Sequence, residues 1–263
     1  MHIPFWQIIV LAIVQGIAEF LPISSSGHVV LVAALFGATP ERFDVVELNI
    51  FLHLGTFASI VAYYWRQIAR LLSEDRRVAG LLVLGTIPAV AAALLLKATG
   101  LDDWLQSPLL AACCLLATGA MLLWTSRQTG GETDYRTLSW LRGLMIGIAQ
   151  AAAVLPGISR SGTTIAAGLT AGLRPQQAAT FSFLLALPAI LGASAWEIMQ
   201  RFGEPATDMQ TPLSQLIGGA LIAAAVGYVS IGVLVRTLEK RKLHWFAWWC
   251  FIAGSGMLLW LAW

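Results

Sequence analysis

Residues 15–28 read QGIAEFLPISSSGH and place a carboxylate, three hydroxyls and an imidazole in an otherwise apolar part of the chain. Gln15 and Glu19 are four residues apart, so a helix would present both side chains on one face. Leu21 precedes a proline, which disfavours the helical conformation, and the serines that follow are good N-caps. The stretch therefore predicts a helix that ends near Leu21 and a second helix that begins near Ser24.

The composition around this stretch is that of a polytopic membrane protein. Of the 263 residues, 58% are hydrophobic and 11% are charged, and the mean hydropathy is +0.76, whereas soluble domains contain about 25% charged residues. The net charge of +2 is too small to indicate a nucleic-acid partner. The amino terminus has no basic region or small-residue cleavage site, so we expect it to belong to the mature fold. Three cysteines without metal-ligand spacing are expected to be small buried hydrophobic residues: Cys113, Cys114 and Cys250.

Two apolar stretches are interrupted. Stretch 3–36 breaks at 22–27 and stretch 140–173 breaks at 156–162, which leaves halves that are mostly short for crossing a bilayer. Such backbone is tolerated at membrane depth only where protein or a polar cavity surrounds it. We therefore predict an all-α polytopic membrane protein with two re-entrant helix-turn-helix hairpins, whose breaks mark a site, and six transmembrane helices near 46–65, 78–96, 106–126, 178–199, 213–235 and 244–262.

Basic residues are distributed unevenly between the predicted loops. Three lie on one side, Arg42, Lys97 and Arg201, against twelve on the other. Because basic loops stay in the cytoplasm, we expect both termini outside, the first hairpin entering from outside and the second from the cytoplasm. The twelve are Arg66, Arg70, Arg76, Arg77, Arg127, Arg136, Arg142, Arg174, Arg236, Lys240, Arg241 and Lys242.

The two breaks also resemble each other in sequence. GIAEFLPISSSG at 16–27 aligns with GIAQAAAVLPGISRSG at 147–162, with four extra residues in the second copy. An odd number of spans in each half inverts the second copy, and such inverted repeats place a site near the midplane at the repeat interface. We therefore predict a single membrane domain, 1–263, built from repeats 1–125 and 137–263.

The second break carries a cation. Residues 156–164 read PGISRSGTT, and no acidic residue occurs from Leu138 to Ala195. An arginine without a partner at membrane depth predicts a functional site, and a guanidinium suits bidentate phosphate binding. The structural alternative is that Arg160 pairs with Glu19 or caps backbone.

Both breaks supply hydroxyls at a helix start, where free N–H groups and the helix dipole favour phosphate. His28 follows within the first turn of its helix, and it could accept a proton, attack phosphorus or bind metal, although a lone histidine on an apolar helix is more often only hydrogen-bonded. Together the hairpins supply what is needed to hold an anionic, oxygen-rich group and a divalent cation.

With these motifs the chain resembles the undecaprenyl pyrophosphate phosphatase (bacitracin-resistance protein) family, bacterial membrane enzymes that remove the terminal phosphate from a lipid carrier diphosphate. The resemblance runs essentially end to end. It rests on Gln15-x-x-x-Glu19 for the family's (Glu/Gln)-x-x-x-Glu motif, FLPISSSGH at 20–28, PGISRSGTT for its Pro-Gly-x-Ser-Arg-Ser-x-x-Thr motif, FLHLGT, and FSFLLALPAILGA. It implies a bacterial plasma-membrane enzyme that faces the periplasm and recycles undecaprenyl phosphate for cell-wall synthesis.

The resemblance also implies roles for individual residues. Glu19 and Gln15 would bind a divalent cation, Mg²⁺ or Ca²⁺, and Ser25 and His28 are the candidates for nucleophile and base, beside Glu19 and Arg160 as catalytic groups. Gln15 is the less acidic option of its motif, and Ser26 stands where many members have threonine. The phosphate-binding set would be Ser24, Ser26, Gly27, Ser159, Arg160, Ser161, Gly162 and Thr164.

A transporter or flippase for a phosphorylated lipid or small anion is the alternative, because inverted repeats with a midplane anion site are typical of transporters. A carrier needs phosphate donors but no nucleophile or base, so the Ser25 and His28 pair favours an enzyme. A purely structural membrane protein would leave the polar groups at both breaks unexplained. The expected partners are a long-chain prenyl diphosphate and the bilayer; the sequence leaves a homodimer open, and it does not say which group attacks.

Overall fold

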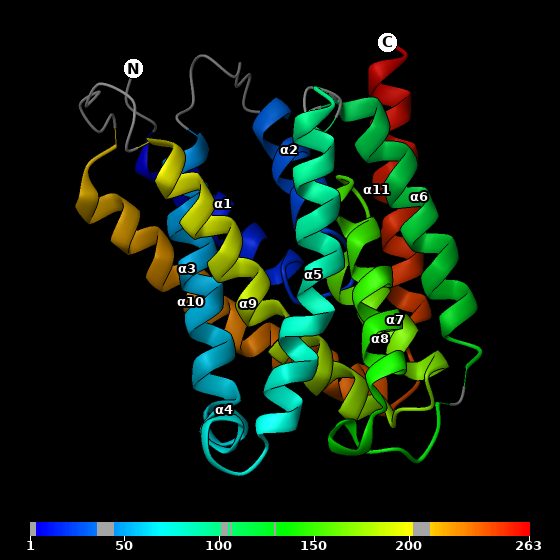
Figure 1. The fold of residues 1–263 in the computed structure, drawn as a ribbon. Helices are drawn as coiled ribbons and strands as arrows, with labels where there is room; N and C mark the ends of the chain where they lie inside the picture. The colour runs from blue at the N-terminus through cyan, green and yellow to red at the C-terminus, as the bar shows by residue number, and fades with distance from the viewer. Residues whose placement is uncertain (1–3, 36–44, 101–104, 106, 129, 202–210) are drawn as a thin grey trace.

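The structure is a computed structural model that describes residues 4–35, 45–100, 105, 107–128, 130–201 and 211–263, and these residues are almost entirely helical (Figure 1). The described residues form no strand beyond one isolated bridge between Thr133 and Leu173. The helices are α1 (Phe5–Ala18), α2 (Ser25–Leu35), α3 (Val45–Tyr63), α4 (Trp65–Ser73), α5 (Arg76–Ala98), α6 (Pro108–Thr125), α7 (Trp140–Ala151), α8 (Arg160–Thr170), α9 (Pro175–Arg201), α10 (Leu213–Glu239) and α11 (His244–Leu261), with short 3-10 turns η2 (Tyr135–Thr137) and η3 (Ala152–Val154).

Each of the six predicted spans coincides with a helix: α3, α5, α6, α9, α10 and α11. Among the described residues, α5, α6, α9 and α10 are long and apolar enough to cross a membrane, and α3 with α4 makes a fifth if this pair, bent by 78°, is one span. The remaining predicted span, α11, falls outside that set. The protein is therefore a multi-pass helical chain, with four or five apolar helices of spanning length in the part that the structure describes.

Both predicted breaks separate pairs of shorter helices. Pro22 lies between α1 and α2, and η3 lies between α7 and the start of α8. Each first helix of a pair packs closely on a long helix from the other half of the chain. A Cβ on Gly16 of α1 would lie 2.9 Å from the carbonyl oxygen of Ala223 in α10, and one on Gly147 of α7 would clash with that of Gly85 in α5. Any larger side chain at these two glycines would push the helices apart.

The two breaks touch each other in the interior of the molecule. A Cβ on Gly27 would lie 3.3 Å from the Cα of Gly157, which itself has a φ of +91°. Phe20, fully buried, packs edge-on against Phe183 of α9, with ring centres 5.5 Å apart. These contacts hold the first break against the second break and against α9.

Contacts between the basic connections gather at one end of the molecule, where α4 also lies (Figure 1). Arg77 donates to the carbonyl oxygens of Arg136 and Leu138, and Arg136 lies 3.3 Å from a carboxylate oxygen of Asp75. Connections that were predicted to share a side of the membrane thus lie together. Arg42, on the opposite side of that prediction, is outside the described residues.

The cysteine prediction is right for Cys114 and Cys250, which are buried, and wrong for Cys113, which is exposed. Successive residues of a helix point in directions about 100° apart. One of two adjacent cysteines on α6 therefore faces outward when the other faces the core. An apolar run does not reveal which residue that is.

Candidate active site at the two breaks

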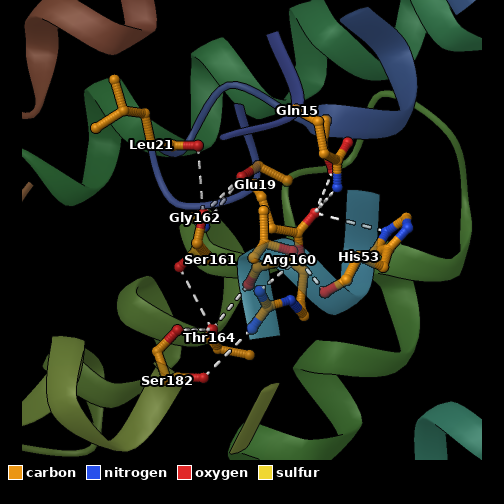
Figure 2. A network of polar contacts seen from close by, with 12 residues as sticks. Gln15, Glu19, Leu21, His53, Arg160, Ser161, Gly162, Thr164 and Ser182 are labelled. Carbon is orange, nitrogen blue, oxygen red and sulfur yellow. Dashed lines mark hydrogen bonds and ion pairs between the residues drawn. The ribbon is translucent and has the colours of Figure 1, made fainter. Parts of the chain in front are cut away.

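Glu19 is the centre of the site (Figure 2). Its Oε1 accepts a hydrogen bond from Arg160 Nη2 at 2.9 Å, and its Oε2 accepts from Ser25 Oγ at 2.7 Å and from Gln15 Nε2 at 3.1 Å. The side chain of Glu19 is only 6% exposed. The predicted convergence of Gln15 and Glu19 on one helix face is confirmed, and Ser25 and Arg160 join them from the starts of α2 and α8.

The ion pair corrects the expectation that Arg160 lacks a partner. Its Nη2 binds Glu19, and its Nη1 donates to the carbonyl oxygen of Ser182 in α9 at 3.4 Å. The local sequence around Arg160 contains no carboxylate, and the partner comes from 141 residues away. The pair offsets the charge of a buried carboxylate, which otherwise would be costly to desolvate.

The two breaks use the same local hydrogen bonds. Ser24 Oγ accepts from Gly27 N–H at 3.4 Å, and Ser159 Oγ accepts from Gly162 N–H at 3.1 Å. Ser24 Oγ lies 3.3 Å from Ser26 Oγ, just as Ser159 Oγ lies 3.2 Å from Ser161 Oγ. Each first serine therefore caps its helix, and each second serine supports the cap. Gly27 and Gly162 were predicted to bind phosphate, but in this structure their backbone N–H groups donate to the capping serines.

The remaining predicted phosphate ligands extend from Arg160 along α8. Ser161 donates to the carbonyl oxygen of Leu21 at 3.4 Å, which links the second break to the first. Thr164 Oγ1 lies 2.6 Å from Ser182 Oγ, and both residues are buried. Ser182 was not predicted as a site residue, since a lone serine in the apolar α9 sequence gives no signal of its own.

His28 does not pair with Ser25 in this structure. Its Nδ1 contacts the carbonyl oxygen of Ser24 at 2.9 Å, and its Nε2 accepts a hydrogen bond from Trp249 Nε1 at 2.8 Å. Both ring nitrogens are thus taken, while Ser25 donates to Glu19 instead. The prediction that His28 is the base for Ser25 does not match this arrangement, which offers the carboxylate of Glu19 in that place.

His53 of α3 is a second group that the sequence reasoning did not place in the site. Its Nδ1 contacts the carbonyl oxygen of Asn49 at 2.9 Å, so Nδ1 carries a hydrogen and Nε2 of the neutral ring has a lone pair. That Nε2 lies 3.8 Å from Glu19 Oε2. This nitrogen is therefore a candidate ligand for a cation beside Glu19. The motif FLHLGT at 51–56, which contains His53, was the sequence signal that could have placed this histidine in the site.

The sequence leads us to expect a divalent cation, and Glu19 and His53 are the groups at this site that could hold one. Among the described residues, no group of three or more His, Cys, Asp and Glu could hold an ion. Glu19 Oε2 and His53 Nε2 lie 3.8 Å apart, and Gln15 presents its Nε2 to Glu19 in this structure, so the Gln15 oxygen would bind an ion only after its amide rotates. An ion with so few protein ligands completes its shell with water and substrate phosphate, as Mg²⁺ usually does.

This arrangement can perform nucleophilic chemistry on an anion. A serine hydroxyl lies at 2.7 Å from a carboxylate that can take its proton, and a guanidinium binds the other oxygen of that carboxylate. The starts of α2 and α8 both lie at the site, and their dipoles favour negative charge there. The geometry is that of a hydroxyl nucleophile, a base and a cationic group that can hold phosphate.

Comparison with known proteins gives matches over nearly the whole chain. Residues 8–256 match the family model described as bacitracin resistance protein BacA. An undecaprenyl-diphosphatase of Rhodopirellula baltica is 47% identical over 253 residues, which cover 96% of each chain. Undecaprenyl-diphosphatases of Desulfosudis oleivorans and Methanosphaera stadtmanae are 38% and 36% identical, with 97% and 94% of each chain covered.

Proposed function

We propose, since the chain belongs to the bacitracin resistance protein BacA family, that it is a membrane hydrolase that converts undecaprenyl diphosphate to undecaprenyl phosphate and inorganic phosphate. The single observation that carries this proposal is the contact of Ser25 Oγ with Glu19 Oε2 at 2.7 Å, with Arg160 on the other carboxylate oxygen. This triad supplies a nucleophile, a base and a phosphate-binding cation at one point.

In the first step, Ser25 Oγ attacks the terminal phosphorus while its proton passes to Glu19 Oε2. The bond between that phosphorus and the bridging oxygen breaks, and the electron pair leaves with the prenyl phosphate. Arg160 is within reach to hold the equatorial phosphate oxygens, where charge-assisted hydrogen bonds are strongest. The product of this step is a phosphorylated Ser25 and a protonated Glu19.

In the second step, water attacks the phosphoserine. Glu19 gives its proton to the departing Ser25 oxygen and takes one from the attacking water, and inorganic phosphate is released. Loss of that last proton to solvent restores the Glu19 carboxylate and returns the site to its starting state. The hydroxyls of Ser161 and Thr164, next to Arg160 on α8, complete the proposed phosphate contacts. When bound between Glu19, His53 and Gln15, a divalent cation would offset the charge of the diphosphate.

We also propose the finer topology, with six spans, two re-entrant hairpins and both termini on the periplasmic side. The inverted repeat is supported by the equivalent glycines that pack α1 on α10 and α7 on α5. It is supported again by equivalent contacts to the breaks, where Thr118 of α6 donates to the carbonyl oxygen of Gly157 at 2.8 Å, and Cys250 of α11 contacts that of Pro22 at 3.8 Å. The contacts among the basic connections support one cytoplasmic end.

The test is phosphate release by purified protein in detergent from a long-chain prenyl diphosphate. Glu19→Gln keeps the shape of the side chain and removes the base, so we expect its rate to fall by about 10²–10⁴-fold. Glu239→Gln is the matched control, because Glu239 binds Gln176 at an exposed site away from the breaks. Binding of the diphosphate without any release of phosphate would instead favour the transporter alternative.

A further inference from the structure

Trp249 of α11 reaches the first break from the other end of the chain. Its indole Nε1–H donates to His28 Nε2 at 2.8 Å. The ring centres are 6.1 Å apart and the ring planes differ by only 14°, so the two rings are nearly parallel. The lone pair of His28 Nε2 accepts the indole N–H.

The two contacts of His28 determine its tautomer. The carbonyl oxygen of Ser24 can only accept, so Nδ1 must carry the hydrogen in the 2.9 Å contact. The indole of Trp249 can only donate, so Nε2 must be the acceptor. His28, 8% exposed, is thus held as the Nδ1–H tautomer and has no free nitrogen for a proton from Ser25.

The carbonyl oxygen that His28 holds belongs to a strained turn. Ser24 has a φ of 70°, in the left-handed region that residues other than glycine rarely adopt. The His28 backbone N–H also donates to this oxygen, at 3.2 Å. Since Ser24 directly precedes Ser25, the conformation of this turn sets the direction in which Ser25 approaches Glu19.

The second repeat makes the same brace with a simpler side chain. Thr163 corresponds to His28 in the aligned breaks, and its hydroxyl donates to the carbonyl oxygen of Ser159, which corresponds to Ser24. Ser159 has a φ of −76°, so the hydroxyl of Thr163 holds an ordinary cap, whereas His28 holds the left-handed turn at Ser24. We propose that Trp249 and His28 are positioning residues, which fix the Ser24 turn and so orient Ser25 toward Glu19; this rests on the phosphatase function proposed above.

The first test compares two replacements of His28 that have the same shape as each other and differ only in a hydroxyl. His28→Thr supplies a hydroxyl that can reach the Ser24 carbonyl as Thr163 reaches that of Ser159, whereas His28→Val has the same shape and no donor. We expect His28→Thr to retain at least about ten times the kcat of His28→Val, with KM within about twofold, since misplacement of a reacting group by ~1 Å can cost about 10²-fold. Equal loss of activity in both variants, each folded as judged by thermal stability, would overturn the proposal.

The second test addresses Trp249. Trp249→Phe keeps the aromatic ring and removes the N–H, so we expect about a tenfold lower kcat and no further loss when it is combined with His28→Thr. Trp248→Phe, at an exposed neighbour on α11, is the control and should be unchanged. Wild-type turnover in Trp249→Phe would overturn the role of Trp249.

A third measurement needs no substitution and no activity. In protein labelled with ¹⁵N-histidine, His28 should show a protonated Nδ1 and an unprotonated Nε2, with the balance shifted toward the other tautomer in Trp249→Phe. A wild-type His28 with a protonated Nε2 would refute the proposal even if phosphate is released. Absence of phosphate release by the wild type would refute the function instead, and would leave this tautomer test intact.

Discussion

Replacement of Arg160 by lysine tests how the site recognises phosphate. Lysine keeps the positive charge beside Glu19 but loses the planar fork, which in this structure reaches both Glu19 at 2.9 Å and the carbonyl oxygen of Ser182 at 3.4 Å. A point charge cannot hold these groups and the phosphate oxygens in one plane. The loss of one well-placed donor to the transition state is worth about 2.7–4 kcal/mol, or about 10²–10³-fold in kcat.

The assay is steady-state release of phosphate from a long-chain prenyl diphosphate in detergent, with kcat and KM measured separately. Arg174→Lys is the matched control, because Arg174 pairs with Glu132 at 2.8 Å through side chains that are 54% and 89% exposed. Exposed pairs contribute about 0–1 kcal/mol, so this control should be close to wild type. Thermal stability of both variants separates lost chemistry from lost fold.

An Arg160→Lys variant within about threefold of wild-type kcat/KM would refute the reasoning, since a loss of ~0.6 kcal/mol is too small for a transition-state contact. Arg160 would then serve only to offset the buried charge of Glu19. A rise in KM with unchanged kcat would show that the guanidinium binds substrate and transition state equally. Only a fall in kcat supports the proposed role in phosphoryl transfer.

Four further predictions concern the nucleophile, the divalent cation, the membrane topology and the second break. Ser25→Ala should lower the rate by at least about 10²-fold, because it removes the nucleophile; substantial turnover, measured by phosphate release, would contradict this. A chelator should abolish activity and Mg²⁺ or Ca²⁺ restore it, and Gln15→Glu should lower the metal concentration for half-maximal rate, whereas full activity of metal-stripped protein would refute the cation. A cysteine introduced beside Arg241 should resist an impermeant thiol reagent added to intact cells, and labelling would reverse the topology. Gln150→Glu should fail to restore phosphate release to Glu19→Gln, because a carboxylate at position 150 would have no donor beside it.

The sequence predicted the helices and the breaks well because their signals are local. Runs of apolar residues set the lengths of α5, α6, α9 and α10, and Pro22 together with the serine caps set the end of α1 and the start of α2. Periodicity, prolines and caps act within a few residues, so they can be read from a single chain. The repeat was predicted in the same way, from residues that its two copies share at the caps.

The arrangement of the site could be predicted only in part, because its contacts join distant segments. The Gln15 and Glu19 contact spans four residues and was predicted, whereas the Arg160 and Glu19 pair spans 141 and was considered only as the alternative. The nearness of Ser25 and His28 in sequence suggested a pair that the fold does not form. Within α2, the two side chains point to different partners, Glu19 and Trp249.

The asymmetry of the two repeats explains why a carboxylate cannot simply be moved to the second copy. Gln150 corresponds to Glu19, but the four extra residues that include η3 separate it from the cap of α8. Its Nε2 contacts the Gly85 carbonyl oxygen at 3.4 Å, and its Oε1 is buried with no hydrogen-bond partner in the described structure. A glutamate there would face a carbonyl and no donor, and an uncompensated buried charge is destabilising by about 3–5 kcal/mol. Ser25 and Arg160, which occupy corresponding positions, both contact the one carboxylate at Glu19, so one copy contributes the proposed nucleophile and the other the guanidinium. Restored phosphate release in the Glu19→Gln, Gln150→Glu double variant would show that the second copy retains an equivalent site, and would refute this account.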